Sequence, residues 1–292
     1  MSGISISSGI AAVDRYLAGG YLAVPGMSSR FAAAIACATL RIQSENGIAG
    51  HAAEIGTFEG RFFIALAHSL SDGEKMIGVD HFSWPDPGLR ERLEQNCTQA
   101  GVRGDRLIVV HENSRKLRPR FMRSLAPNSS IRFFHIDGDH SPRALAHDLR
   151  LAAATLDPRG VICLDDMLHP RYPRLAIVVD EFLRAHNRMR VFCIVDREDI
   201  IAAAKFMICR DSEFKFYKSA LANAFPQYVW PRGAEFVSFK RAGVRRLWMG
   251  GDIQTAGYHA LVLAPDPKVP NVVGRTEPHD PAELRTPSTG TG

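Results

Sequence analysis

The sequence lacks any apolar run that approaches the roughly 18 residues needed for a membrane-spanning helix. It also lacks a basic segment ahead of its first apolar stretch, and Asp14 and Arg15 interrupt that stretch. We therefore expect no signal peptide. These absences predict a cytoplasmic protein that has no membrane partner.

Cysteine is scarce, and none of the five cysteines belongs to a C-x-x-C pair. An odd number without such pairs predicts neither a disulfide framework nor a zinc knuckle. Three of the five lie in apolar, strand-like runs, where a thiol behaves as a small hydrophobic residue. We therefore predict reduced core cysteines, as in a cytosolic protein.

A strong excess of one charge is absent as well, because the net charge is only +5. Apolar residues make up 46% of the 292 residues, which is enough for one large domain with extensions or for two small ones. The most basic stretch contains Arg115, Lys116, Arg118, Arg120 and Arg123. A nucleic acid or a phosphorylated substrate is the alternative partner, but no nucleic-acid-binding module accompanies the stretch. We interpret it as the solvated face of one helix.

Short apolar runs alternate with helix-length segments between residues 51 and 210. The expected strands are residues 52–56, 76–80, 107–111, 132–137, 160–165, 191–195 and 205–209. The expected helices between the first six strands are residues 61–70, 89–100, 114–125, 142–155 and 173–187. This alternation predicts an α/β fold with a parallel sheet covered on both faces. The last connection is short, which favours an antiparallel last strand.

Four segments follow from these patterns. We expect residues 1–50 to be helical, with one helix over 30–46, and to fold over the site as a lid. Residues 51–212 form the predicted sheet domain, and residues 213–264 an aromatic-rich α/β extension. Residues 265–292 are rich in proline and poor in large apolar side chains, so we predict a disordered tail.

A glycine-containing turn follows the first predicted strand in the sequence AEIGTFEGRFF. Glu54, Gly56 and Gly60 form an E-x-G-x-x-x-G pattern that leads into a helix. Glycine permits positive φ and close backbone approach, and the helix N-terminus offers free N–H groups. Phe58 stands where the dinucleotide fingerprint has its second glycine, which argues against a nicotinamide dehydrogenase. A purely structural turn is an equally good interpretation of this pattern alone.

Polar side chains also follow the next two predicted strands. Asp80 is placed to accept both hydroxyls of a ribose, and Asn113 with Ser114 is placed to contact an adenine. Ligands bind at this edge of an open α/β sheet, so three such strand ends in succession indicate a nucleotide-like ligand. Capping of the following helix is the alternative for each residue, and it is strongest for Asn113 and Ser114.

The fourth and fifth predicted strands end in carboxylates, at Asp137 and at Asp165–Asp166. Carboxylates brought together repel each other, and oxygen-only ligands suit a hard cation, magnesium above all. His140 follows Asp137 by three residues and is placed to act as a general base. Asp165 or Asp166 could instead cap the loop, and His140 could bind substrate or order the loop. Asp139 we interpret mainly as a helix cap.

These motifs together resemble a known family. E-I-G-x-x-x-G, H-I-D-G-D-H-S and G-V-I-C-L-D-D, within residues 51–210, resemble class I S-adenosylmethionine-dependent methyltransferases of the methyltransferase-24 type. That type is akin to the macrocin and mycinamicin sugar O-methyltransferases and, more distantly, to catechol O-methyltransferase. The resemblance implies a Rossmann-like, doubly wound sheet of seven strands, mostly parallel, with the last strand antiparallel.

The resemblance also implies a cofactor site for S-adenosylmethionine. The methionine part would lie over Gly56 and Gly60, the ribose on Asp80, and the adenine near Asn113 and Ser114. The complete predicted set of cofactor-binding residues is Glu54, Gly56, Thr57, Gly60, Asp80, His81, Asn113, Ser114 and Asp137.

The metal-using relatives hold a divalent ion with three acids that match Asp137, Asp165 and Asp166. A histidine that matches His140 is the proposed base in the mycinamicin-type enzymes, so the predicted catalytic residues are His140 and Asp137. The ion, expected to be Mg²⁺, would bind the acceptor hydroxyl and lower its pKa.

The expected function is therefore magnesium-assisted O-methylation of a small hydroxylated acceptor, either sugar-like or a natural product. The loop after the acid pair reads MLHPRYPRLA, where many relatives have an aromatic residue and W-P-G-V, so the acceptor is not identified. His169, Arg171 and Tyr172 on this loop are candidate substrate contacts. The alternatives are a non-catalytic binding protein with the same fold and a nucleic-acid methyltransferase. A homo-oligomer is left open.

Overall fold

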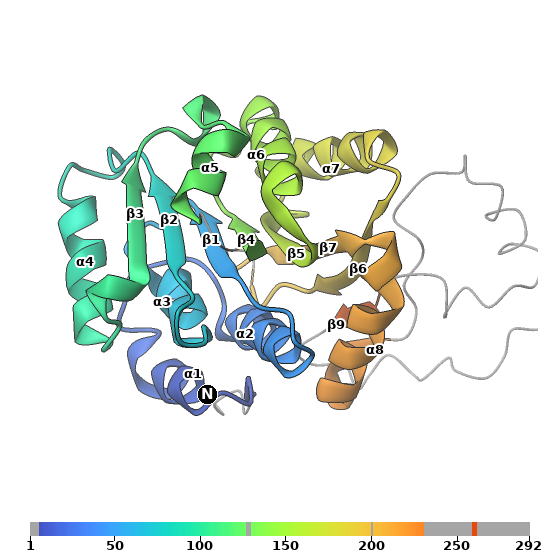
Figure 1. Ribbon diagram of the computed structural model, residues 1–292, viewed down its shortest axis with the longest axis horizontal. Coiled ribbons are helices and arrows are strands. Elements are labelled where there is room, and N and C mark those ends of the chain that lie inside the picture. The colour runs from blue at the N-terminus through green and yellow to red at the C-terminus, as the bar shows by residue number, and fades with distance from the viewer. Residues whose placement is uncertain (1–5, 127–129, 200, 231–258, 262–292) are drawn as a thin grey trace, which may run out of the picture.

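A mixed β-sheet forms the centre of the molecule (Figure 1). The computed structural model describes residues 6–126, 130–199, 201–230 and 259–261. Within them the strand order is β3-β2-β1-β4-β5-β7-β6-β9-β8. The strands are β1 (His51–Ile55), β2 (Met76–Asp80), β3 (Leu107–His111), β4 (Ile131–Ile136), β5 (Leu156–Met167), β6 (Met189–Val195), β7 (Ala204–Arg210), β8 (Val229–Trp230) and β9 (His259–Leu261).

The first seven strands have the predicted topology. Strands β1 to β5 are parallel to one another, and β7 is antiparallel to both β5 and β6. Every residue of β1 and β4 is buried, as expected for parallel strands that are covered on both faces. The predicted Rossmann-like sheet is confirmed, and β9 and β8 extend it beyond β6.

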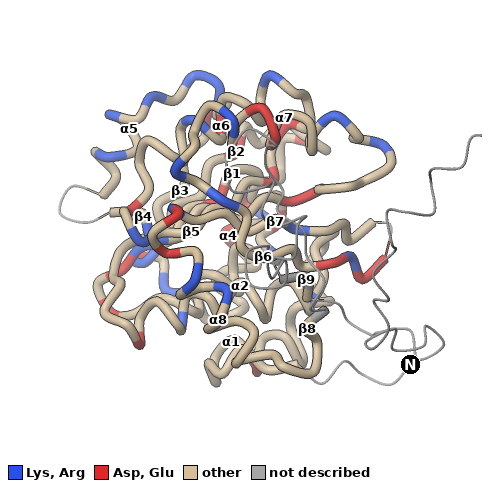
Figure 2. Tube along the Cα trace, turned by 90° about the vertical axis from the view of Figure 1, so that its right-hand side faces the viewer, with Lys and Arg blue, Asp and Glu red and all other residues tan. Residues whose placement is uncertain are grey.

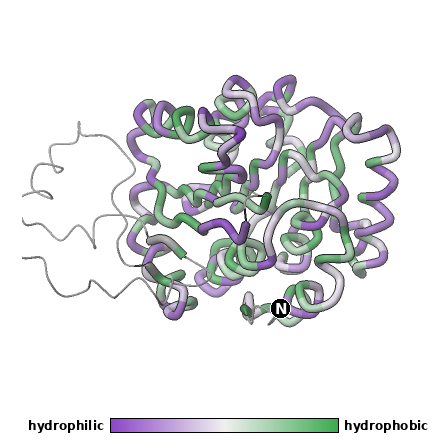
Figure 3. The backbone as a smooth tube through the Cα atoms, turned by 180° about the vertical axis from the view of Figure 1, so that it is seen from behind, coloured by the Kyte–Doolittle hydropathy of each residue, from purple (hydrophilic) through white to green (hydrophobic). Residues whose placement is uncertain are grey.

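Helices cover both faces of the sheet (Figure 1). One face packs against α2 (Arg30–Glu45), α3 (Arg61–His68), α4 (Leu89–Gln99) and α8 (Phe214–Ala224), and the other against α5 (Pro119–Leu125), α6 (Pro142–Thr155) and α7 (Arg174–Ala185). Each face has its own apolar core. Figure 3 shows hydrophobic stretches in the central strands and hydrophilic ones in the outer helices and loops.

The N-terminal segment contributes to the first of these cores. A short helix α1 (Ala11–Arg15) continues into a π-helix (Tyr16–Gly20), and α2 then packs against α3 and α8. Ser29 caps α2, because its hydroxyl accepts a hydrogen bond from the N–H of Ala32 at 3.0 Å. The expected lid role of residues 1–50 stays a prediction. The predicted extension 213–264 contains α8, β8 and β9, and the predicted tail 265–292 lies outside the described residues.

One predicted helix is wrong as a single element. Residues 114–125 form a 3₁₀ turn (Ser114–Lys116) and then α5, which begins at Pro119. Proline disfavours the helical conformation of the preceding residue, and Arg118 is extended with φ −122° and ψ 152°. The basic side chains of this stretch are exposed, and Figure 2 shows Lys and Arg along α5.

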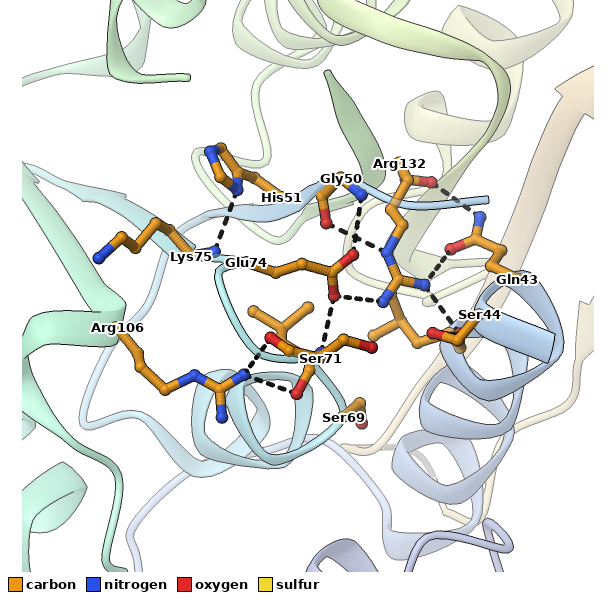
Figure 4. A network of polar contacts seen from close by, with 12 residues as sticks. Gln43, Ser44, Gly50, His51, Ser69, Ser71, Glu74, Lys75, Arg106 and Arg132 are labelled. Atoms are coloured by element: carbon orange, nitrogen blue, oxygen red, sulfur yellow. Dashed lines mark hydrogen bonds and ion pairs between the residues drawn. The ribbon is translucent and has the colours of Figure 1, made fainter. Parts of the chain in front are cut away.

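A buried polar network ties the start of β4 to α2 (Figure 4). The guanidinium of Arg132, which is 0% exposed, donates hydrogen bonds to the carbonyl of Gly50 at 3.1 Å and to that of Leu40 at 2.8 Å. It also pairs with Glu74 at 2.6 Å and bonds to Gln43 at 3.1 Å. Because the chain satisfies this buried charge in full, Arg132 fixes β4, and with it the strand end that carries Asp137.

Two further predictions concern the whole chain. All five cysteines are free and buried, as predicted. Among the residues that the structure describes, no helix combines the length and apolar character that crossing a membrane requires.

Candidate active site

The carboxyl ends of β1 to β5 bring the predicted site residues to one edge of the sheet. Ile55 pairs with Ile136, and Ile136 pairs with Leu164. Asp137 and Asp165 therefore lie side by side, each one residue beyond these pairs. We call Asp137, Asp165 and Asp166 the acid cluster. The structure brings the glycine turn next to this cluster, because Gly56 packs against the backbone of Asp137.

The glycine turn is dictated by the backbone of the neighbouring strand. Gly56 has φ +85°, and a Cβ atom placed on it would lie 1.8 Å from the carbonyl oxygen of Asp137. Gly60 has φ +94° and precedes α3, and its Cβ would meet a side-chain methyl of Leu93 at 2.6 Å. Both residues adopt positive φ. A Cβ at Gly60 would meet a side chain, which can move aside, whereas a Cβ at Gly56 would collide with backbone, which cannot.

Substitution of Gly56 by alanine is expected to destabilise the protein more than substitution of Gly60 by alanine. Both changes place a Cβ at positive φ, at a cost of about 1–3 kcal/mol, but G56A also pushes the end of β4 away. Urea denaturation of both variants measures the difference. Equal losses of unfolding free energy would contradict the role assigned to the Asp137 carbonyl.

Asp80 stabilises two turns, the glycine turn after β1 and the turn that follows its own strand, β2. Its carboxylate accepts hydrogen bonds from the N–H of Phe58 at 3.1 Å and from that of Phe82 at 2.9 Å, and Thr57 Oγ1 lies 3.5 Å away. Phe58 and Phe82 have φ of 47° and 49°, which is unusual for residues that are not glycine. Asp80 therefore orders the edge where the ribose is predicted to bind. His81 is exposed, and its Nδ1 lies 3.1 Å from the backbone N–H of Ser83.

Asn113 and Ser114 follow β3, the next strand along the edge. The side-chain oxygen of Asn113 accepts the N–H of Arg115 at 3.0 Å, so the capping interpretation has support. The carbonyl of Ser114 accepts a hydrogen bond from His147 Nε2 at 3.0 Å. Their predicted adenine contacts stay predictions.

His140 is held from two sides. Its Nε2 bonds to a carboxylate oxygen of Asp166, and its ring stacks on Tyr172 with centroids 4.2 Å apart and an interplanar angle of 12°. A carboxylate only accepts hydrogen bonds, so Nε2 carries the proton and Nδ1 is the nitrogen left to accept one. Burial lowers the pKa of His140, but the hydrogen bond and charge of Asp166 outweigh it, and the pKa is raised above its ordinary value.

Asp139 behaves as the predicted cap of α6. Its carboxylate accepts the N–H of Ser141 at 2.8 Å, and Ser141 caps the helix through the N–H of Ala144. The loop from Asp137 to Ser141 is thus ordered by its own side chains, which sets the position of His140.

A buried cation that the sequence analysis missed lies in the acid cluster. Lys205 on β7 is 1% exposed, and its ammonium forms an ion pair with Asp165. Burial raises the pKa of Asp165, but the charge of Lys205 outweighs burial and lowers it to about 2. Asp137 has no such partner, so burial and the charge of Asp165 raise its pKa well above the ordinary value.

The polar contacts continue behind Lys205. Its ammonium lies 3.2 Å from His135 Nε2, and His135 Nδ1 lies 2.6 Å from Glu54. Because an ammonium only donates, Nε2 of His135 accepts and its Nδ1 carries the proton. Burial lowers the pKa of His135 well below its ordinary value, and burial raises that of Glu54 well above its own. Glu54 is therefore engaged by the protein interior, and its predicted cofactor contact stays a prediction.

The acid cluster fits a divalent cation in part. Asp137, His140 and Asp166 offer ligand atoms within 4.8 Å of one another, and so do His135, Asp137 and Asp165. The carboxylates of Asp137 and Asp166 are the hard oxygen donors that Mg²⁺ prefers. Asp165 is different, because Lys205 already neutralises it.

The loop after the acid pair lies against His140. Tyr172 stacks on the imidazole, and His169 is tilted against Tyr172 with centroids 5.0 Å apart. Arg171 is exposed, and Leu168 is 46% exposed with φ +61°. His169 and Tyr172 thus lie beside the predicted base, whereas Arg171 has no described side-chain contact with it.

Two residues of this site had weak signals in the sequence. A lysine inside the apolar run AKFMIC is unusual, since lysine is almost never fully buried unless it is paired. Ser28 lies just before the predicted helix over 30–46, where serine commonly serves as a cap, but its hydroxyl donates a hydrogen bond to Asp165 at 3.0 Å. The N-terminal segment therefore reaches the acid cluster.

Comparisons with known proteins agree with this geometry. Residues 53–167 match a family model described as a methyltransferase domain. An O-methyltransferase from Bacillus cereus, solved in complex with SAH, is similar with a TM-score of 0.50 and 17% identity, over 68% of this chain and 90% of that one. The O-methyltransferase NovP is similar with a TM-score of 0.51 and 13% identity, over 62% of this chain and 80% of that one. A search of curated proteins finds no match.

The family match confirms the predicted methyltransferase domain over residues 53–167. It covers the segment from the third residue of β1 through the end of β5, which includes the glycine turn, His140 and the acid pair. The identities to the two solved structures are low, so these structures support the fold alone.

Proposed function

We propose that this protein transfers the methyl group of S-adenosylmethionine to a hydroxyl of a small acceptor, with Mg²⁺ at the acid cluster. The observation that carries the proposal is His140, fixed by Asp166 and Tyr172 beside the acid cluster and the glycine turn. An imidazole held with one ring nitrogen left to accept a proton favours catalysis over binding alone.

The cofactor would lie along the ends of β1 to β4. The methionine part is proposed over Gly56 and Gly60, the ribose on Asp80, and the adenine near Asn113 and Ser114. Glu54, Thr57, His81 and Asp137 complete the proposed set. Support comes from the common edge at which these strands end.

His140 would take the proton of the acceptor hydroxyl on Nδ1. Asp166 holds the opposite nitrogen and stabilises the imidazolium that forms, and Tyr172 keeps the ring in plane. Mg²⁺, held by Asp137 and Asp166, would lower the pKa of the acceptor hydroxyl. Asp165 was predicted as a third metal ligand, but its ion pair with Lys205 competes with binding of the ion.

The acceptor is proposed to be a small hydroxylated molecule, sugar-like or a natural product. His169 and Tyr172, which lie beside His140, are the proposed contacts on one wall. The reduced, buried cysteines are consistent with work in the cytoplasm.

Calorimetric titration with S-adenosylhomocysteine tests the cofactor site. We expect micromolar binding by the wild type, and a loss of about 10- to 100-fold in D80N, because a charged acceptor of two ribose hydrogen bonds is removed. D139N is the matched control, since Asp139 caps α6 instead, and its affinity should not change. No binding by the wild type, with or without Mg²⁺, would refute the proposed function.

A further inference from the structure

Lys205 is the most completely surrounded charged group at the site. Besides Asp165, its ammonium contacts Ser28 Oγ at 3.3 Å and His135 Nε2 at 3.2 Å, and it lies 4.6 Å from the centroid of the Phe62 ring. A buried ammonium needs such partners, because water does not reach it. Lys205 therefore has no low-cost position other than the one it occupies.

Asp165 is correspondingly occupied on both oxygens. Oδ1 accepts the backbone N–H of Asp166 at 2.8 Å, and Oδ2 accepts the hydroxyl of Ser28 while it pairs with Lys205. The carboxylate of Asp137 has no hydrogen bond within the described chain. Of the three acids predicted to bind metal, Asp165 is thus the one whose charge the protein itself has neutralised.

A divalent ion bound to Asp165 would lie within a few ångströms of the ammonium. The repulsion between these charges is strong where water is excluded, and Lys205 cannot move away into solvent. With Asp165 neutralised, the carboxylates of Asp137 and Asp166 remain without a lysine or arginine partner, and their charge matches one divalent ion. One oxygen of Asp166 bonds to His140, which leaves the other oxygen for the ion.

We propose that Lys205 is a positioning residue that keeps Asp165 out of metal coordination, so that the ion is held by Asp137 and Asp166. This inference rests on the proposed function only in assuming that a divalent ion binds. It assigns Lys205 the task of fixing which carboxylates face the ion, through a charge supplied from β7 on the far side of β5.

Titration of the full chain with Mn²⁺, followed by electron paramagnetic resonance, tests the inference. D165N should change the Mn²⁺ dissociation constant by less than about threefold, whereas D166N, the matched change at the adjacent residue, should raise it by at least about tenfold. Weakening by D165N as large as that by D166N would overturn the inference. Absence of Mn²⁺ binding to both the wild type and K205M would also overturn it.

Removal of the ammonium gives an independent test. K205M should bind Mn²⁺ at least about tenfold more tightly than the wild type, because Asp165 is then free to join the ion. The gain should disappear in K205M/D165N, which removes both charges and so avoids a buried, unpaired carboxylate. If K205M fails to fold, the comparison of D165N with D166N still decides. S-adenosylhomocysteine binding in the same samples separates failure of this inference from failure of the proposed function.

Discussion

Substitution of His140 by asparagine is expected to lower kcat by about 10²- to 10⁴-fold, the usual contribution of a positioned general base. Asparagine retains a hydrogen-bonding partner for Asp166 but cannot take the acceptor proton. Binding of S-adenosylhomocysteine should be unchanged, because His140 lies among the acceptor-side residues. The measurement is methyl transfer to a small hydroxylated acceptor that the wild type methylates, together with calorimetry.

H169N is the matched control for this experiment. His169 lies on the same loop, and its ring contacts Tyr172 and accepts the N–H of Arg171. Among the described residues, only its backbone N–H, and not its imidazole, bonds to the acid cluster. Its substitution should act mainly on KM for the acceptor. If H140N keeps full kcat, or if H169N loses as much kcat as H140N does, then the assignment of the base is wrong.

The pH dependence of the reaction follows from the same hydrogen bond. The pKa of His140 is raised by Asp166 against the effect of burial, and a general base works only when it is deprotonated. The rate should therefore rise with pH through a midpoint above about 6.5, the ordinary imidazole value. Substitution of Asp166 by asparagine should move that midpoint to lower pH.

The sequence predicted the sheet because the signal for it is local. Parallel strands that are buried on both faces appear as short apolar runs, and each run was followed by a helix-length segment. Strands β8 and β9, which extend the sheet beyond β6, are only 2 and 3 residues long, which is too short for any periodicity. The helix at 114–125 was wrong for a local reason, since the effect of Pro119 on Arg118 was not considered.

The acid cluster was predictable, but its internal pairing was not. Strand ends could be placed at one edge from topology alone, which brought Asp137 and Asp165 together. The position of Lys205 depends on the antiparallel register of β7 against β5, which is shifted between Leu164 and Met167. Ser28 meets Asp165 across 137 positions of sequence. Such contacts are set by the packing of distant elements, for which no short sequence pattern exists.

The largest expected effect on stability also comes from a buried ion pair, that of Arg132 with Glu74. Substitution by methionine should lower the free energy of unfolding by about 3–5 kcal/mol, because it leaves the buried carboxylate of Glu74 without its cation. The carbonyls of Leu40 and Gly50 lose their donors as well. Urea denaturation measures the change, and a loss below about 1 kcal/mol would contradict the role of this network in holding β4.

Two further variants separate the charge from the packing. In R132M/E74Q the unpaired carboxylate is gone, so the double variant should be more stable than R132M alone, as expected when the main cost is an uncompensated buried charge. R184M removes the ion pair of Arg184 with Asp180, whose side chains are 48% and 31% exposed, and should cost less than about 1 kcal/mol. If R132M and R184M lose the same free energy, burial does not set the value of the Arg132 pair. If only R132M causes a large loss of unfolding free energy, the buried ion pair of Arg132 stabilises β4 at its start. It thereby also fixes the end of this strand, where Asp137 lies.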